Sequence, residues 1–183
     1  MPSWRGVGVV TKATLGAITI CLVAAALEGL LAGRGVKRRL SQLRQPPHSP
    51  SFAVWVGIGL CYYLICFVVL SRLMSSTRSP LWRAAFALVV ALLLGNALWN
   101  LVFFRLRNVE ASTIVLVAYV AIAAILAILL NFIDPISGWV FLPYLIYLAY
   151  ATWWLLSLRR LNREVRGEVA FYDAPAVKPS DGD

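Results

Sequence analysis

The sequence predicts an all-α integral membrane protein that folds as a bundle of five transmembrane helices. Of its 183 residues, 61% are hydrophobic and only 14% are charged, and the mean hydropathy is +0.79. These values lie far outside the range of soluble globular domains. The chain also contains five apolar runs, each close to the roughly 20 residues that a helix needs to cross a bilayer. The expected helices cover about residues 8–32, 51–73, 81–105, 110–132 and 137–158.

The first expected helix, about residues 8–32, also fits a cleaved signal peptide. Arg5 and Lys12 precede its apolar stretch, and the three alanines at 24–26 resemble a signal-peptidase site. Cleavage there would remove residues 1–26 and leave four helices. Both interpretations stay open at this point.

The segment after the first helix, residues 33–50, is expected to be a basic loop. It carries five of the 17 Lys and Arg residues and ends in three prolines. Proline removes a backbone donor and clashes with the preceding turn, so it cannot continue a helix. The second helix is therefore expected to begin only after Pro50.

The last four helices follow one another through short polar connections, "MSSTRSP", "RLRN" and "FIDPIS". Connections this short make neighbouring helices antiparallel. In the last connection Asp134 precedes Pro135, which is typical of a turn. Beyond the fifth helix, residues 159–183 are expected to form a polar tail, and its end, "PAVKPSDGD", has the composition of a disordered segment.

The distribution of basic residues predicts the orientation in the membrane. Residues 33–50, the connection before the fourth helix and the tail share one side, which carries 12 of the 17 Lys and Arg residues. The positive-inside rule places this side and the C-terminus in the cytoplasm, with the N-terminus outside. The net charge of +9 is then explained by topology and anionic lipid headgroups. Nucleic-acid binding is not expected, because the basic residues do not lie on one face of a compact domain.

Residues able to carry hydrolytic or metal chemistry are sparse. Cys21, Cys61 and Cys66 lie inside apolar runs without a C-x-x-C pair, so neither a zinc site nor a disulfide framework is expected. The single histidine, His48, stands in the proline-rich loop with no nearby carboxylate or nucleophile. The sequence therefore predicts no catalytic residue and no metal site.

Polar side chains at membrane depth are costly unless they are paired or line a cavity, so they are the candidates for function. One face of the third helix carries Asn96, Trp99, Asn100 and Phe103 at helical spacing. The functional interpretation is a ligand pocket, in which an amide orients a polar group and the rings contact a flat apolar surface. The alternative is that the asparagines hydrogen-bond to a neighbouring helix.

Aromatic residues recur at helical spacing in two other expected helices. A stripe in the fifth helix combines Tyr147, Tyr150 and Trp154 beside the small residue Ala151, and the second helix places Trp55 and Tyr62 two turns apart on one face. These residues could complete the lining of a pocket. Such stripes are more often helix packing.

Two further features concern contacts between helices. Ala91 and Gly95 form a small-xxx-small pair, which permits close helix approach either in a homodimer or within the chain. Glu28 lies near the cytoplasmic end of the first helix, where a salt bridge to an arginine of the basic loop is expected. A proton relay would require a second carboxylate inside the membrane, and none is evident.

The chain resembles the TspO/MBR family, the tryptophan-rich sensory and translocator proteins that include the peripheral benzodiazepine receptor. The third helix carries the family pattern N-x-x-W-x-x-x-F-F as Asn96, Trp99, Phe103 and Phe104. The fifth helix, "PYLIYLAYATWWLLSLRRLN", matches a second pattern at Pro143, Tyr144, Leu145, Ala151 and Asn162. The second helix matches more loosely, at Pro50 and Tyr62. The resemblance covers about residues 10–162.

The departures from the family pattern lie at aromatic positions. Ile58 stands where the second helix of the family has tryptophan, and Tyr147 replaces the tryptophan of the fifth helix. Some bacterial members use these tryptophans in light-dependent porphyrin breakdown, so the resemblance does not carry that activity to this chain. Leu156 replaces the tyrosine of a sterol-associated motif, which puts sterol binding by that route in doubt.

The resemblance implies a receptor or sensor that binds a tetrapyrrole, such as a porphyrin or haem, or another flat apolar ligand such as a sterol or carotenoid. No cofactor is required, and the bound molecule could equally be another pigment or a lipid. The expected lining is Asn96, Trp99, Phe103, Tyr147, Ala151, Tyr62 and Trp55. Residues 33–50 would form a lid whose arginines could meet ligand carboxylates. The alternative is a diverged scaffold or accessory subunit of a larger membrane complex.

Overall fold

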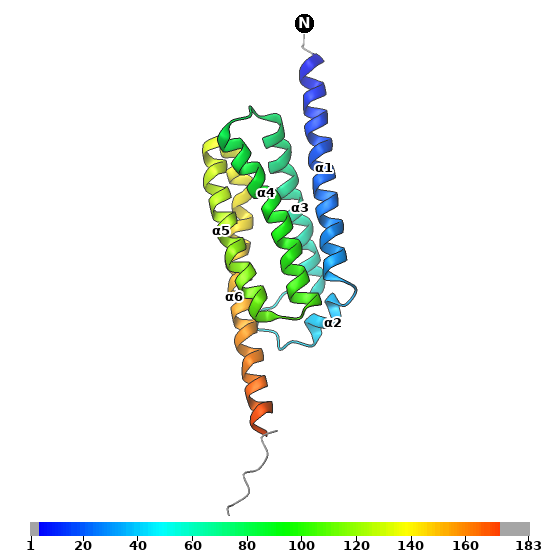
Figure 1. The fold of residues 1–183 in the computed structure, drawn as a ribbon, viewed down its shortest axis with the longest axis vertical. Helices are drawn as coiled ribbons and strands as arrows, with labels where there is room; N and C mark the ends of the chain where they lie inside the picture. The colour runs from blue at the N-terminus through cyan, green and yellow to red at the C-terminus, as the bar shows by residue number, and fades with distance from the viewer. Residues whose placement is uncertain (1–3, 173–183) are drawn as a thin grey trace, which may run out of the picture.

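The computed structural model describes residues 4–172, with side chains over residues 12–163. Its elements are all helical, and no strand occurs within 4–172. They are α1 (Trp4–Ala32), α2 (Val36–Ser41), α3 (Phe52–Ser75), α4 (Pro80–Asn100), the π-helical turn η1 (Leu101–Arg105), α5 (Val109–Ile133) and α6 (Pro135–Tyr172) (Figure 1). The end of the predicted tail, residues 173–183, lies outside the described residues.

Five of these helices are long and apolar enough to cross a membrane: α1, α3, α4 extended by η1, α5 and α6. The predicted fold class is therefore confirmed, and the protein is an integral multi-pass membrane protein. In Figure 1 the α3–α4 and α5–α6 connections lie at the upper end of the bundle, and α2 and the α4–α5 connection lie at the lower end. These two ends are called upper and lower below.

Three of the helix starts have a local cause. The side-chain oxygens of Ser51, Ser79 and Asn108 each accept a hydrogen bond from the backbone N–H three residues later, at 3.4, 3.0 and 2.9 Å. Each of these N-caps contributes about 1 kcal/mol by satisfying a donor that the helix itself cannot pair. Helices α3, α4 and α5 consequently begin within one residue of the positions expected from hydropathy alone.

Two elements differ from the prediction. Residues 33–50 contain the short helix α2, because Val36 and Leu40 lie one turn apart and are half-buried while Lys37 and Arg38 face outward. Helix α6 does not end near residue 158 but continues to Tyr172 through part of the expected polar tail. This stretch contains no proline, and its leucine, arginine and glutamate residues favour helix.

An ionic contact also supports the extension of α6. Arg159 and Arg163, one turn apart on α6, both pair with Glu110 in the first turn of α5, and the Arg163–Glu110 distance is 3.5 Å. The pairs fasten the lower part of α6 to the start of α5.

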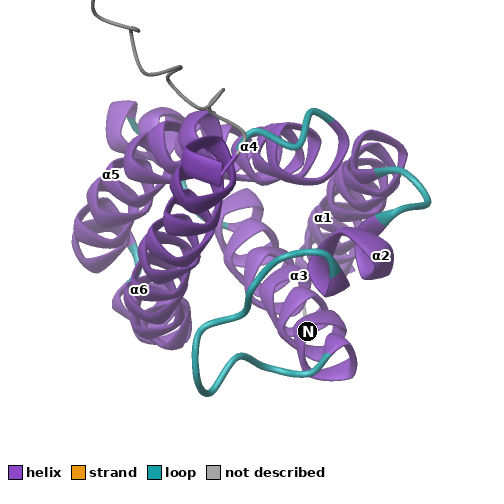
Figure 2. Ribbon diagram, turned by 90° about the horizontal axis from the view of Figure 1, so that it is seen from below, coloured by secondary structure: helices purple, strands orange, loops and turns teal. Residues whose placement is uncertain are grey.

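The helices form a closed ring in the order α1, α4, α5, α6, α3. Helix α1 packs on α3 and α4, α5 packs on α4 and α6, and α3 packs on α6. Figure 2 shows this ring from the lower end. Because α3 and α6 are neighbours although the sequence separates them by two helices, side chains of the second and fifth spans can meet.

The Ala91–Gly95 face is used inside the chain at Gly95. A Cβ atom added to Gly95 would lie 2.9 Å from Cδ2 of Tyr119 on α5. The Tyr119 ring is 4% exposed, and its hydroxyl is hydrogen-bonded to the hydroxyl of Tyr144. Of the two contacts that the pair permits, the one within the chain is present at Gly95, where the ring of Tyr119 on α5 fills the space that the missing side chain leaves.

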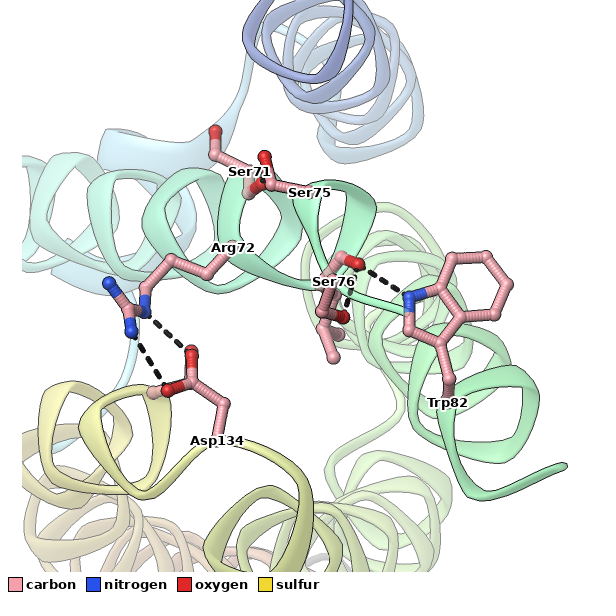
Figure 3. Close-up of polar contacts among 8 residues, drawn as sticks. Ser71, Arg72, Ser75, Ser76, Trp82 and Asp134 are labelled. Carbon is pink, nitrogen blue, oxygen red and sulfur yellow. Dashed lines mark hydrogen bonds and ion pairs between the residues drawn. The ribbon is translucent and has the colours of Figure 1, made fainter. Parts of the chain in front are cut away.

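At the upper end, Asp134 occupies the turn before α6, as its position predicts, and also pairs with Arg72 of α3. The guanidinium donates two hydrogen bonds to the carboxylate, at 2.6 and 2.8 Å (Figure 3). The Ser137 hydroxyl donates a third at 2.6 Å. In the same figure the indole of Trp82 points to the end of α3, where it donates to the Leu73 carbonyl. These contacts join three helices at this end.

Replacing Asp134 by Asn is expected to lower the thermal stability modestly and to flatten its decline in acid. The Arg72 guanidinium, followed by the Ser137 hydroxyl, holds the pKa of Asp134 below its usual value. Because the folded pKa is the lower one, this stabilisation is complete above the ordinary aspartate pKa of about 3.9 and is lost as the pH falls through the folded value. The Arg72 side chain is 38% exposed, so the effect should not exceed about 1 kcal/mol.

The measurement is the melting temperature of the wild type and of Asp134→Asn in detergent between pH 7 and pH 3. An equally steep acid decline in both proteins would contradict the assigned role of this carboxylate.

Candidate functional site

A cavity of about 460 Å³ lies among the lower halves of the helices. This volume is in the range of small-molecule pockets. Ten of its 25 lining residues are aromatic and none is Lys, Arg, His, Cys or Met, so the cavity suits a flat, largely apolar molecule. The lining is contributed by α1, α2, α3, α4 and α6, with single residues or pairs from η1 and α5.

Six of the seven residues expected to line a pocket do so. They are Trp55 and Tyr62 from α3, Asn96 and Trp99 from α4, and Tyr147 and Ala151 from α6. The seventh, Phe103, is fully buried in η1 and does not reach the cavity. Its ring stacks on Trp99 with centroids 4.8 Å apart and an interplanar angle of 9°. Phe103 therefore belongs to the core and contacts the ligand site only through the ring of Trp99.

Aromatic rings of α3 and α6 meet across one side of the cavity. Trp55 contacts Trp154 edge to face at 4.9 Å between centroids, and Tyr62 lies 4.9 Å from Tyr144. Trp55 also contacts Tyr147 at 6.4 Å. Aromatic pairs in such arrangements stabilise each other beyond their area burial. The result is a continuous aromatic wall built from two helices that are distant in sequence.

A polar cluster also lines the cavity, around the carboxylate of Glu28. Oε2 accepts hydrogen bonds from the Tyr63 hydroxyl at 2.6 Å and from Nδ2 of Asn96 at 2.7 Å. Oε1 accepts one from Nδ2 of Asn100 at 3.1 Å. Three helices, α1, α3 and α4, thus meet at one carboxylate. All four side chains line the cavity.

This cluster corrects one expectation and refines another. Glu28 was expected to pair with an arginine of the basic loop, but its hydrogen-bond partners are neutral groups in the bundle, because the helix turn that carries Glu28 faces α3 and α4 rather than the loop. Asn96 and Asn100 make the interhelical bonds that were the alternative to a pocket, and they line the pocket as well. In the sequence, two amides one turn apart in an apolar helix indicate that a neighbouring helix carries a polar partner for them.

The indole N–H of Trp99 is a further polar group at this site. Its Nε1 is buried and has no hydrogen-bond partner within the described residues. Buried donors are rarely left unpaired in folded proteins. Trp99, which lines the cavity, therefore offers an indole N–H that is not used within the described residues.

Residues 42–50 close the lower side of the bundle and are tied to α6. Asn162 makes two hydrogen bonds with the backbone of Arg44, both at 3.1 Å, one in each direction. The Trp154 indole donates to the Ser49 hydroxyl at 3.0 Å, and the Tyr150 hydroxyl donates to the His48 carbonyl at 3.2 Å. Figure 2 shows this connection reaching from α2 across toward α6 before it returns to α3. These contacts hold residues 42–50 against α6, and residues 33–50 are called the lid below.

The lid's contribution to the cavity is apolar. Val36 and Leu40 of α2 line the cavity, whereas none of the arginines of residues 33–50 does. Arg39 donates instead to the backbone carbonyl of Arg107 in the α4–α5 connection, at 3.1 Å. These arginines therefore lie outside the cavity lining, and a contact between them and ligand carboxylates stays a prediction.

Replacing Asn162 by Ala is expected to loosen the lid. The change removes two hydrogen bonds worth about 1 kcal/mol each, so amide exchange around Arg44 should accelerate about tenfold or more. Hydrogen–deuterium exchange of peptides covering residues 42–50 measures this. Asn162→Asp keeps the acceptor for the Arg44 N–H and loses the donor, so an intermediate rate is expected. Unchanged exchange in Asn162→Ala would show that other contacts hold the lid.

The cavity is not sealed on every side. Phe52, Val56 and Leu60 of α3 line it and are also 41%, 48% and 68% exposed, and Gly29 of α1 is both lining and exposed. These residues mark an opening between the lower parts of α1 and α3. Because the opening lies within two membrane-spanning helices and is bordered by apolar side chains, it faces the lipid.

A family model described as the TspO/MBR family matches residues 17–160. No curated protein matches the chain significantly. The matched region contains the second, third and fourth spans, most of the first and fifth, and every lining residue of the cavity.

Proposed function

The chain belongs to the TspO/MBR family, and from this premise we propose that it is a membrane receptor or sensor that binds a flat, largely apolar small molecule inside the helix bundle. A tetrapyrrole is the leading chemical class. The observation that carries the proposal is the cavity of about 460 Å³ with its aromatic wall of Trp55, Tyr62, Tyr147 and Trp154. Rings arranged in this way offer large apolar area at low entropic cost.

Among tetrapyrroles, a metal-free porphyrin fits the described lining better than haem. Protein ligands of haem iron are most often His, Cys or Met, and none of these lines the cavity. Tyrosine serves more rarely. Of the five tyrosines that line the cavity, Tyr119 and Tyr144 are hydrogen-bonded to each other and Tyr63 to Glu28, which leaves Tyr62 and Tyr147. Binding would therefore rest on ring contacts and hydrogen bonds rather than on iron coordination.

The orientation proposed for the chain places the lower end and the C-terminus in the cytoplasm. The support is the charge distribution, in which most Lys and Arg residues lie in residues 33–50, in the α4–α5 connection and along the end of α6. A hydrophobic ligand would then reach the cavity through the opening between α1 and α3, from the lipid.

A scaffold subunit without a ligand is the second candidate. In that case we would expect the aromatic side chains to fill the space between the helices. The open cavity and the unpaired Trp99 N–H favour ligand binding instead. Isolation in mild detergent separates the two functions, because a stoichiometric protein partner would favour the scaffold.

Titration of the purified protein with protoporphyrin tests the proposal. Three of the seven tryptophans, Trp55, Trp99 and Trp154, line the cavity, so saturable quenching of tryptophan fluorescence is expected. The absorbance spectrum of the protein as purified gives an independent readout of a bound pigment. Quenching that rises linearly without saturation, together with a spectrum free of pigment, would refute the proposed ligand class.

A further inference from the structure

The Glu28 carboxylate has no positively charged partner among the described residues. Its three hydrogen-bond donors, Tyr63, Asn96 and Asn100, are all neutral, and it takes part in none of the described salt bridges. No Lys or Arg lines the cavity that it faces. A carboxylate at membrane depth therefore stands at the wall of a ligand-sized space with hydrogen bonds but without a countercharge.

A carboxylate without a countercharge costs free energy inside a membrane protein unless other groups stabilise its charge. Charges inside a protein are normally paired, and an ionisable side chain within a span marks a functional site. A carboxylate offers about four acceptor positions, two on each oxygen. Tyr63 and Asn96 occupy those of Oε2, and Asn100 occupies one of Oε1. One acceptor position on Oε1 is left for a further donor.

The rest of the cavity lining suits a cation. Aromatic faces attract positively charged groups, and cages of aromatic rings recognise ammonium ligands. Five aromatic residues line the cavity together with Glu28: Tyr63 and Trp99, which lie on α3 and α4 like the hydrogen-bond partners of Glu28, and Trp55, Tyr147 and Trp154. The basic side chains of Lys37 and Arg38 lie on the exposed face of α2, where water and salt screen them.

We propose that the part of a ligand that lies against the Glu28 carboxylate carries a positively charged nitrogen, and that the cavity discriminates against ligands of the same shape that place a carboxylate there. The propionates of a porphyrin would then lie away from Glu28. The inference rests on the proposed function only in taking this cavity as the ligand site. It adds the chemical class of the polar group and names Glu28 as the residue that determines specificity.

Three flat probes of one shape test the proposal: 9-aminoacridine, which is a cation at neutral pH, uncharged acridine, and acridine-9-carboxylate. Binding is measured as saturable tryptophan quenching in an uncharged detergent. The wild type is expected to bind the cation at least about tenfold more tightly than the carboxylate, with acridine between them. Glu28→Gln, which has the same shape without the charge, is expected to bind the three probes with similar affinities. Its affinity for acridine is expected to differ from that of the wild type by less than about threefold.

The matched control is Glu110→Gln, which makes the same substitution at an exposed glutamate that lies outside the cavity. It is expected to keep the wild-type order of affinities. Equal affinity of the wild type for cation and carboxylate would overturn the inference, whatever the variants do. Persistence of the order in Glu28→Gln would overturn the assignment to Glu28. If protoporphyrin and all three acridines fail to bind, the proposed function itself falls, whereas binding of protoporphyrin alone refutes only the cation preference.

Discussion

Replacing Gly59 by Phe is expected to abolish ligand binding while the protein still folds. Gly59 lies one turn after Trp55 and just under one turn before Tyr62, so all three share the cavity face of α3. A Cβ atom added to Gly59 would have no neighbour within 4 Å. A phenylalanine side chain would therefore begin in open space on the cavity face, and its ring would occupy the space of the ligand.

The expected loss is at least about 100-fold in affinity for protoporphyrin, which corresponds to about 2.7 kcal/mol. The readout is the same saturable tryptophan quenching, and phenylalanine leaves the number of tryptophans unchanged. Stability should hold or rise slightly, because glycine is a poor residue in a helix interior.

Gly57→Phe is the matched control, since Gly57 lies on the same helix, also has open space around it, and does not line the cavity. This variant is expected to bind like the wild type. Wild-type affinity in Gly59→Phe would mean that the ligand binds elsewhere. Equal losses in both variants would point to a general effect on α3.

Replacing Gly95 by Val is expected to cause the largest loss of stability. The first added carbon would lie 2.9 Å from the ring of Tyr119, closer than real contacts allow, and the two methyl groups would add further overlap. The ring cannot move aside easily, because it is 4% exposed and hydrogen-bonded to Tyr144. Relief would require α4 and α5 to separate, which also opens the packing of their neighbours.

Overpacking of this kind costs about 3 kcal/mol, which for a domain of this size corresponds to a fall of about 6–12 °C in the melting temperature. Thermal unfolding in detergent, followed by circular dichroism, measures it. Gly57→Val makes the same substitution where there is open space and is expected to change the melting temperature by less than about 2 °C. A similar small change in Gly95→Val would show that the helices approach less closely than the geometry implies.

Features that act over a few residues were predicted well. The apolar runs marked the five spans, and Ser51, Ser79 and Asn108 now explain why three helices begin where hydropathy placed them. Helical spacing also identified which residues of one helix share a face. Asn96 with Trp99, and Tyr147 with Ala151, were grouped correctly for this reason and do line one cavity.

Features that depend on which helices meet could not be predicted in the same way. Glu28 and Asn96 are 68 residues apart and share a hydrogen bond only because α1 packs against α4. Phe103 shares a helical face with Trp99, yet the π-helical turn and the packing behind it leave Phe103 in the core. Val36 and Leu40 of the basic segment line the cavity, which the charge of that segment did not predict.

The sequence by itself determined the membrane environment, the five spans, the family and the aromatic character of a site, because hydropathy, capping and motif spacing are properties of single segments. Only the tertiary structure decided that Glu28 belongs to the cavity, that Gly95 serves an internal contact, and that Asn162 fastens the lid. The physical reason is that the order and rotation of the helices depend on how all their side chains pack at once. No single segment carries that information.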